Sequence, residues 1–515
     1  MSEMVEPAGT AELLKELPHR LHLSFSTSAE STPDRLALVD DNLKLTYGDL
    51  SRTVTSTAVR LRDLGVRPGD RMMIVSENCV ALVALLFAAS SIDAWAIVVN
   101  PRLSARELDL IKDHSGARRI FIGAGISAHA AEHARRLGAS EARLPSLPGM
   151  SVTELRSDTN PEPVSDDRAQ QVAVLVYTSG TTGTPKGVML THENVLFSAS
   201  AIAKTREFCA DDTVYLVLPI SHIAGMAVLL MTMLTGGTAR LAHRYEPSEL
   251  ADAISKQGVS VVYGVPATYQ KLLEYADAAN RSLGRNRLRA LAVVGAPMDP
   301  SLKARVRERI GLNLLNGYGI TECAPGISGS RMDVSDDDLS VGPLLPGIEA
   351  KIVSTDRATL PEGEVGELHV RGRYVMKGYY RAADLTAQVV DREGWFNTGD
   401  LAYFKGDQLF IAGRTKEMII RSGFNVYPAE VEAVLNSHAA VSQSAVVSRP
   451  VDGNEEVVAF VQLVSGATAT AADILAYAGA QLTAYKRPAE VIILPEFPAS
   501  STGKILKRKL ADSLL

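Results

Sequence analysis

Short apolar runs recur along most of the chain, and they restrict its fold more than any other feature of the sequence. Up to about residue 410 they alternate with segments of helix length, and the clearest are RMMIVS, AIVVN, RRIFIG, VAVLVY, VYLVLP, VSVVYGV, LRALAVVGA and LNLLNGYG. Short apolar runs next to helical patterns are typical of mainly parallel sheets whose strands are joined by crossover helices. The pattern therefore predicts an α/β fold.

The most apolar segment, VALVALLFAASSIDAWAIVVN, is interrupted by Ser90, Ser91 and Asp93. We therefore expect a buried helix over residues 80–90 and a buried strand over residues 96–99 rather than a membrane span. The N-terminal MSEMVEPAGTAELLKEL has acidic residues early and no positively charged start before an apolar run. A signal peptide is not expected from it.

The length of 515 residues predicts more than one domain, because single cores stop growing near about 250–300 residues. Turn signals between short alternating strands such as AKIV and GELHV predict a small antiparallel sheet or barrel over residues 341–413. We expect an N-terminal domain over residues 1–413, made of two parallel-sheet α/β subdomains plus the small β-barrel. Residues 414–515 would form a smaller α+β domain.

Charge and cysteine content exclude several classes of function. The net charge is -6, from 53 lysines and arginines against 59 aspartates and glutamates, so the chain lacks the basic field of a nucleic-acid binder. Cys79, Cys209 and Cys323 are odd in number and far apart, which fits neither a disulfide framework nor a zinc site. A reducing, cytoplasmic compartment is expected.

A loop rich in glycine and threonine, TSGTTGTPKG, separates the apolar run QVAVLVY from THENVLFSASAIA, a predicted helix with Thr191 as N-cap and Glu193 in its first turn. We expect the loop to connect a strand to a helix. A kinase-type phosphate loop is excluded because Pro185 precedes Lys186 and Gly187 follows it. A flexible linker and a different phosphate-holding loop both remain open. The candidate phosphate-binding residues besides Lys186 are Thr178, Ser179, Gly180, Thr181, Thr182, Gly183 and Thr184.

YTSGTTGTPKG resembles the phosphate loop of the adenylate-forming superfamily of acyl-CoA synthetases, adenylation domains and luciferases. Further motifs of that superfamily follow in order: LPISHIAG, NGYGITE, GELHVRG, WFNTGD, GRTKEMI and PASSTGK. The resemblance implies two steps, in which ATP converts a carboxylate to an acyl-adenylate and a thiol then forms the thioester. It also implies ATP, Mg²⁺ and coenzyme A as cofactors, with Glu322 as the magnesium ligand, Thr321 at the α-phosphate and Lys186 at the departing phosphates.

The same resemblance implies how the adenosine of ATP would be held. Tyr318 would pack against the adenine, Asp400 would accept hydrogen bonds from both ribose hydroxyls, and Arg414 would reach the same ribose. The rim of the adenine site would be completed by Gly295, Ala296 and Pro297.

In the C-terminal block, Lys504 would stabilise the charge of the carboxylate and the α-phosphate during adenylation, and Lys416 would be the hinge about which this domain rotates. Gly423 and Phe424 would line the tunnel for the pantetheine arm, where many relatives have a second glycine in place of Phe424. The segment that meets the CoA nucleotide would contribute Tyr485, Lys486 and Arg487.

His222 matches the residue that gates the acid site in the superfamily. The expected wall around it is small or apolar and includes Ile223, Ala224, Gly225, Met226, Ala227, Gly317, Pro325, Gly326 and Ile327. Such a wall favours an uncharged hydrophobic acyl group, either fatty or aryl and arylpropenoic, and disfavours dicarboxylates and amino acids.

The expected function is therefore an ATP- and CoA-dependent ligase for a hydrophobic carboxylic acid. An acyl-AMP ligase that loads a carrier protein and a non-catalytic sensor are the alternatives, although the sensor would not need Lys186, Glu322, Asp400 and Lys504. PASSTGK has the form that lysine acetyltransferases recognise in related bacterial enzymes, so Lys504 is also a candidate for acetylation. A homodimer is one candidate for the assembly.

Overall fold

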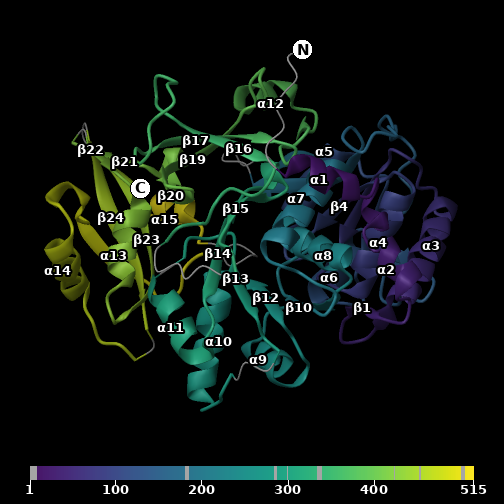
Figure 1. The fold of residues 1–515 in the computed structure, drawn as a ribbon, viewed down its shortest axis with the longest axis horizontal. Helices are drawn as coiled ribbons and strands as arrows, with labels where there is room; N and C mark the ends of the chain where they lie inside the picture. Colours follow the sequence, from purple (N-terminus) through teal and green to yellow (C-terminus); the bar gives the residue numbers. More distant parts are fainter. Residues whose placement is uncertain are drawn as a thin grey trace.

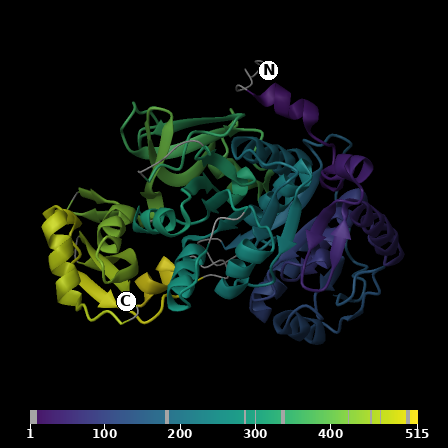
Figure 2. The same ribbon diagram turned by 60° about the horizontal axis from the view of Figure 1, so that its bottom comes forward.

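The structure is a computed structural model that describes residues 9–179, 185–283, 287–298, 300–332, 339–422, 424–451, 454–464, 466–499 and 505–514. Figures 1 and 2 show the yellow and yellow-green C-terminal block gathered at one end of the long axis, away from the purple and blue N-terminal part. The predicted α/β class is confirmed, because two large, mainly parallel sheets with helices on their faces make up most of the molecule.

The first large sheet, which we call the loop sheet, is parallel at its centre, where β3 pairs with β4 and β5, and β4 pairs with β8. Every residue of β3 and β4 is buried, as the apolar runs predict. Its strands are, in order, β18 (Gly378–Tyr379), β9 (Pro185–Thr191), β8 (Val172–Ser179), β4 (Trp95–Val99), β3 (Arg71–Val75), β5 (Arg119–Ile122), β7 (Ser151–Val152) and β6 (Ser140–Glu141).

The second large sheet, which we call the acid sheet, is parallel from β1 through β14 and antiparallel at its two edges. Its strands are, in order, β15 (Gly326–Gly329), β14 (Leu314–Gly319), β13 (Ala290–Val293), β12 (Val261–Gly264), β10 (Thr213–Leu216), β11 (Thr238–Leu241), β1 (Leu36–Val39) and β2 (Lys44–Thr46).

The two sheets share one hydrophobic core, and strand alternation explains how. In β3, Met72 and Ile74 face that shared core, whereas Met73 and Val75 face a separate cluster under α5 and α6. The helices of the shared core are α3 (Tyr47–Asp63), α4 (Val80–Ser91), α7 (His192–Thr205) and α8 (Ile223–Thr235). The outer helices are α5 (Ala105–Ser115) and α6 (Ala128–Arg136) on the loop sheet, and α9 (Pro247–Lys256), α10 (Pro266–Ala278) and α11 (Pro300–Ile310) on the acid sheet.

The apolar segment that resembled a membrane span is a central helix. Residues Val80 to Ser90 of α4 are all buried, and the chain continues into β4 after Ile92, as predicted. Among the described residues, no helix combines the length and the apolar character that crossing a bilayer requires.

The expected strand-to-helix position of the glycine-rich loop is wrong. β8 and β9 form an antiparallel hairpin from Val172↔Thr191 to Ser179↔Pro185, so the loop joins two strands. The sequence PKGVMLT continues the ladder because Val188 and Leu190 enter the core, and Lys186 lies on the same face of the strand, near its start. The predicted helix follows β9, and Thr191 Oγ1 caps it by accepting a hydrogen bond from Asn194 N at 3.1 Å.

After the two large sheets, residues 341–413 contain the predicted small antiparallel sheet. Its strands are β16 (Ile348–Val353), β17 (Gly366–Gly372), β19 (Phe396–Lys405) and β20 (Gln408–Arg414), with α12 (Ala383–Val389) beside β18. The last block has its own apolar clusters and consists of β21 (Ile419–Arg421), β22 (Phe424–Val426), α13 (Pro428–Asn436), β23 (Val441–Val451), β24 (Asn454–Leu463), α14 (Ala471–Gln481), β25 (Glu490–Ile493) and α15 (Lys507–Asp512). Short helices near the N-terminus are α1 (Thr10–Glu16) and α2 (Ser26–Ser31).

Candidate active site

Three residues from distant parts of the chain meet at the end of the hairpin, and we call them the Tyr379 cluster. Lys186 is the second residue of β9, and its Nζ lies 5.1 Å from the centroid of the Tyr379 ring. The Tyr379 hydroxyl donates a hydrogen bond to Glu322 Oε1 at 2.8 Å. Glu322 lies in the 3₁₀ turn Thr321–Cys323, where its backbone oxygen accepts from Met376 N at 2.8 Å. The fold thus brings the predicted Lys186 and Glu322 to the same aromatic ring.

Tyr379 itself was missed by the sequence analysis. Burial and the neighbouring Glu322 carboxylate raise the pKa of Tyr379, so its hydroxyl stays protonated and acts as a donor. Its position is set by the pairing of β18 with β9 through Tyr379↔Val188 at the edge of the loop sheet, which no local sequence pattern indicates. A cavity of about 170 Å³ beside the cluster is lined by His114, Pro185, Lys186, Gly187, Tyr379, Tyr380, Ala382 and Leu385.

A second group, the Asp400 cluster, lies at the junction of the acid sheet and the small antiparallel sheet. The Tyr318 hydroxyl donates to Asp400 Oδ2, and Arg414 Nε lies 3.0 Å from Asp400 Oδ1. Asp400 is opposite Arg414 in the β19–β20 ladder and is only 3% exposed. The three residues predicted around adenosine are therefore brought together by the fold.

The charges of the Asp400 cluster reinforce one another. Burial, followed by the Asp400 carboxylate, raises the pKa of Tyr318 well above its usual range. For Arg414, burial alone would lower the pKa, but Asp400, Glu417, Tyr318 and Glu322 together raise it. The phenol therefore stays neutral, and the guanidinium stays charged.

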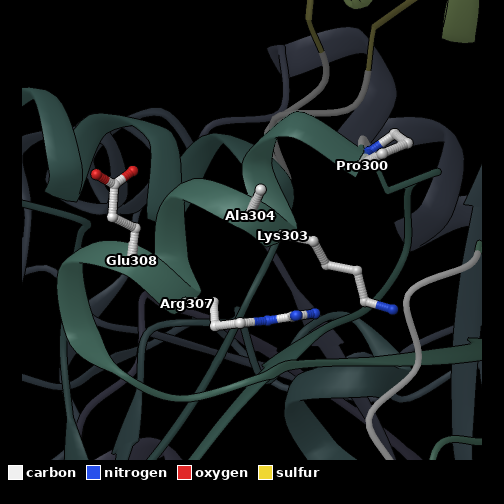
Figure 3. Close-up of a pocket in the computed structure, with 5 residues that line it drawn as sticks. All are labelled: Pro300, Lys303, Ala304, Arg307 and Glu308. Atoms are coloured by element: carbon white, nitrogen blue, oxygen red, sulfur yellow. The ribbon is translucent and has the colours of Figure 1, made fainter.

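Another cavity, of about 310 Å³, lies away from both clusters along α11 (Figure 3). Lys303 and Arg307 extend from the helix in the same direction, whereas Glu308 points away from them. The lining residues are Pro300, Lys303, Ala304, Arg307 and Glu308. We place the chemistry at the smaller cavity, because that one contains Lys186 and Tyr379.

The predicted acid wall begins at the N-terminus of α8. His222 is the N-cap, and its Nδ1 accepts a hydrogen bond from Ala224 N at 3.2 Å. Gly225 is required there, because a Cβ would lie 2.2 Å from the Pro219 carbonyl oxygen. Ile223 and Met226 are buried in the shared core. Gly317 lies on β14, and Pro325 precedes β15, the strand antiparallel to β14.

Asn78, which the sequence analysis did not identify, holds the segment that leads to His222. Its side-chain amide donates to the carbonyl oxygens of Leu216 and Leu218 at 3.2 and 3.0 Å. Its Oδ1 accepts from Ile220 N at 2.8 Å. One buried side chain from the end of β3 therefore links the loop sheet to the end of β10 in the acid sheet.

In the last block, the two segments predicted to meet coenzyme A lie together. The rings of Phe424 and Tyr485 stack with centroids 4.7 Å apart and an interplanar angle of 21°. Arg421 donates to the carbonyl oxygens of Tyr485 and Arg487 at 3.3 and 2.6 Å, which ties the hairpin of β21 and β22 to the turn Ala484–Lys486. Phe424 is 55% exposed, so its ring is accessible.

Other predicted residues belong to neither cluster, and several lie outside the described residues. Thr178 pairs with Lys186 in the hairpin, Thr321 is buried, and Gly295 has a φ of 79° that favours glycine. Ala296 is half-buried and Pro297 is exposed. Outside the described residues lie Gly180, Thr181, Thr182, Gly183, Thr184, Gly423 and Lys504, together with the side chain of Ser179.

Comparison with known proteins places the chain in a family. The profile of the AMP-binding enzymes matches residues 25–380, and that of the AMP-binding enzyme C-terminal domain matches residues 430–504. The chain belongs to the AMP-binding enzymes.

The alignments with similar proteins span nearly the whole length of this AMP-binding enzyme. A feruloyl-CoA synthase from Amycolatopsis sp is 35% identical over 93% of this chain and 96% of the relative. The 4-coumarate–CoA ligase CCL1 of Humulus lupulus is 31% identical over 92% of this chain and 89% of its own. The solved o-succinylbenzoate CoA synthetase of Bacillus subtilis, in complex with its acyl-adenylate intermediate, has a TM-score of 0.80 and 28% identity, and the match covers 95% of this chain and 97% of that one.

The predicted reaction class is confirmed. This AMP-binding enzyme is an AMP-forming acyl-CoA synthetase, which uses ATP to activate a carboxylic acid as the acyl-adenylate and coenzyme A to form the thioester.

Proposed function

We propose that the acid is a hydrophobic arylpropenoic acid. The proposal rests on the wall at His222, where Ile223 and Met226 are buried and apolar and Gly225 lets the helix approach the preceding backbone closely. Burying a second carboxylate against such a wall would need a paired cation. The substrates named for the feruloyl and coumarate relatives have the same chemical character.

Thioester formation across a panel of acids tests this proposal. We expect the highest kcat/KM with arylpropenoic acids, lower values with fatty acids of medium and long chain, and the lowest with short dicarboxylic acids. A clear preference for a fatty acid or for a dicarboxylic acid would overturn it. Supplying a carrier protein in place of free coenzyme A would expose the carrier-loading alternative.

Glu322 is proposed as the protein ligand of Mg²⁺. The donor set fits, because Mg²⁺ is commonly bound by one or two carboxylates together with substrate phosphates rather than by a protein cage. Consistent with this, the part of the chain that the structure describes contains no cluster of three or more His, Cys, Asp or Glu side chains suited to a metal. The bound ion would offset phosphate charge while Lys186 holds the departing phosphates and Thr321 contacts the α-phosphate.

Asp400 is proposed to accept the ribose hydroxyls, with Arg414 beside the same ribose and Tyr318 against the adenine. An ionised carboxylate can accept several hydrogen bonds at once, and the fold places Tyr318 and Arg414 beside this one. Gly295, Ala296 and Pro297 would form the adenine rim. In the last block, the stacked Phe424 and Tyr485, with Arg487, would meet coenzyme A.

We also propose a domain boundary at Arg414 with the hinge at Lys416. The residues on either side of Lys416 are attached to different parts of the molecule. Thr415 Oγ1 donates to Glu367 Oε1 on β17 at 3.1 Å, whereas Glu417 lies 3.4 Å from the ammonium of Lys507 on α15. Lys416 is therefore the point between the two attachments, where a rotation would break neither of them.

Lys504 is proposed to stabilise the charge of the carboxylate and the α-phosphate in the first step. Losing one such donor typically lowers the rate about 10²–10³-fold. We expect Lys504→Ala to remove most acid-dependent ATP–pyrophosphate exchange and to spare thioester formation from supplied acyl-adenylate. Equal loss of both half-reactions would contradict the assignment.

Acetylation of Lys504 is a proposed means of regulation, because it would remove the same charge. Incubation with acetyl-CoA and a lysine acetyltransferase should silence adenylation, and unchanged activity despite acetylated Lys504 would refute this.

A cytoplasmic location is proposed from Cys79, Cys209 and Cys323, which are all free thiols. A homodimer, the commonest symmetric assembly, is proposed as the state to test by light scattering.

A further inference from the structure

The short strand β18 ends at Tyr379, and Tyr380, which follows it, faces the opposite way. Tyr379 contacts Lys186 and Glu322 on the side of the site. The Tyr380 hydroxyl donates instead to Glu162 Oε1 at 2.5 Å, and its ring meets Trp95 edge to face with centroids 5.9 Å apart. Each tyrosine therefore bonds one carboxylate, and the carboxylate that Tyr379 bonds is that of Glu322.

The backbone on both sides of Tyr379 is fixed to the hairpin. Lys377 N donates to Met189 O at 3.0 Å, and Tyr380 N donates to Gly187 O at 2.8 Å. Tyr379 itself is only 6% exposed. Its ring and hydroxyl are therefore held in place by β9, the strand that also carries Lys186.

The Tyr379 side chain stands between a cation and an anion. Its ring faces the Lys186 ammonium, and its hydroxyl donates to the Glu322 carboxylate. Among the contacts of the described residues, Lys186 and Glu322 form no ion pair with each other. A direct pair would occupy both charges with one another before any phosphate arrived, and the ring prevents it while leaving the ammonium on an aromatic face.

We propose that Tyr379 is a positioning residue that keeps Lys186 and Glu322 apart and holds the Glu322 carboxylate by one oxygen, so that its second oxygen is directed to Mg²⁺. The inference rests on the proposed roles of Glu322 and Lys186. Partners that orient a metal ligand typically change metal affinity or activity about 10-fold to 100-fold when they are removed. A purely structural tyrosine would change the unfolding temperature and leave the metal dependence unaltered.

Tyr379→Phe tests the hydroxyl, because it keeps the ring over Lys186 and removes only the bond to Glu322. We expect the Mg²⁺ concentration for half-maximal ATP–pyrophosphate exchange to rise about 10-fold or more, with the KM for the acid unchanged. Binding of Mn²⁺ in the presence of a non-hydrolysable ATP analogue, followed by electron paramagnetic resonance, should weaken to a similar extent. Tyr47→Phe is the control, since it deletes a buried tyrosine hydrogen bond, the one from Tyr47 to the Gly237 carbonyl oxygen, and Tyr47 does not line the cavity.

Tyr379→Leu tests the ring as a separator of charge. We expect Lys186 and Glu322 to pair in this variant, so that the KM for ATP rises beyond that of Tyr379→Phe. If Tyr379→Leu fails to fold, Tyr379→Phe decides alone. The proposal is overturned if Tyr379→Phe has the same metal dependence as Tyr47→Phe in both assays.

Glu322→Gln separates failure of this inference from failure of the proposed site. If Glu322→Gln leaves Mn²⁺ binding unchanged, then Glu322 is not the ligand and both ideas fall. If Glu322→Gln weakens binding and Tyr379→Phe does not, only the role of Tyr379 is wrong.

Discussion

The Asp400 cluster and the Tyr379 cluster contain the same bond, a tyrosine hydroxyl that donates to a carboxylate, yet their charges are arranged differently. Asp400 is buried and lies against the Arg414 guanidinium, so its cation and anion already face each other. In the Tyr379 cluster, the ring separates Lys186 from Glu322. The adenosine side is thus assembled in advance, whereas the phosphate side keeps its charges available for an incoming anion and metal.

This difference predicts that the Asp400 cluster contributes to folding stability, whereas the Tyr379 cluster contributes mainly to activity. A buried carboxylate with bonded partners contributes to folding, because its removal leaves the partners unsatisfied. A half-buried carboxylate with one neutral donor contributes less to folding and is free to change partners. Mutations in the two clusters should therefore be distinguishable by whether they alter unfolding, catalysis or both.

Replacing Glu322 should give the largest effect and confine it to catalysis. We expect Glu322→Gln to lower the rate of adenylation about 10²–10³-fold, because charge stabilisation at the phosphates is lost. The amide keeps an acceptor for Tyr379, so the free energy of unfolding should stay within about 0.5 kcal/mol of wild type. ATP–pyrophosphate exchange and urea unfolding measure the two quantities. A markedly destabilised Glu322→Gln would remove the contrast between the clusters.

Replacing Asp400 should affect folding as well. Asp400→Ala leaves the Tyr318 hydroxyl and the Arg414 guanidinium without this acceptor, and we expect a loss of about 1–3 kcal/mol in urea unfolding, with weaker ATP binding. Tyr318→Phe removes one of the two bonds and should cost about 1 kcal/mol. An Asp400→Ala protein as stable as wild type would show that the pairing in this cluster is not part of the folding energy.

The smallest expected effect is a loss of folding stability as the pH is lowered. Burial, partly opposed by Asp93 and reinforced by Arg20, lowers the pKa of His22 from 6.5 to about 4. Below pH 6.5 the unfolded chain therefore binds a proton that the folded chain does not, and stability falls until folded His22 is protonated near pH 4. This group should cost about 1 kcal/mol by pH 5.5.

His192, whose pKa burial lowers well below 6.5, acts in the same direction. Urea unfolding of wild type and His22→Gln at pH 7.5 and 5.5 checks the His22 contribution. The variant should lose less stability between the two values, and an equal loss would exclude His22. The two site clusters are thus best compared near pH 7.5.

Local patterns in the sequence predicted the elements well where burial alone decides them. The helix at Val80 and the strand ending at Val99 followed from continuous apolar character, and the Thr191 cap followed from its position before an apolar helix. The superfamily motifs singled out Tyr318, Asp400 and Arg414, and the fold assembles them as one group.

Contacts between distant segments could not be predicted in the same way. Tyr379 lies 57 residues from Glu322, and nothing in the sequence KGYY distinguishes the tyrosine that faces the site from the one that faces Glu162. Asn78 bonds backbone atoms about 140 residues away. The expected position of the loop is wrong because PKGVMLT has too short an apolar run to indicate a strand locally, whereas pairing with β8 makes it one.

The hairpin of β8 and β9 fixes the positions of the two residues that flank the glycine-rich segment. Its last pair, Ser179↔Pro185, closes the ladder immediately outside residues 180–184, and β8 is also paired with β4. Changes of composition between those two residues would leave every rung of the ladder in register. A single insertion in β9 between Lys186 and Val188, which share one face, would turn one of the two to the opposite face. Loop chemistry and sheet geometry can therefore evolve, or be engineered, independently of each other.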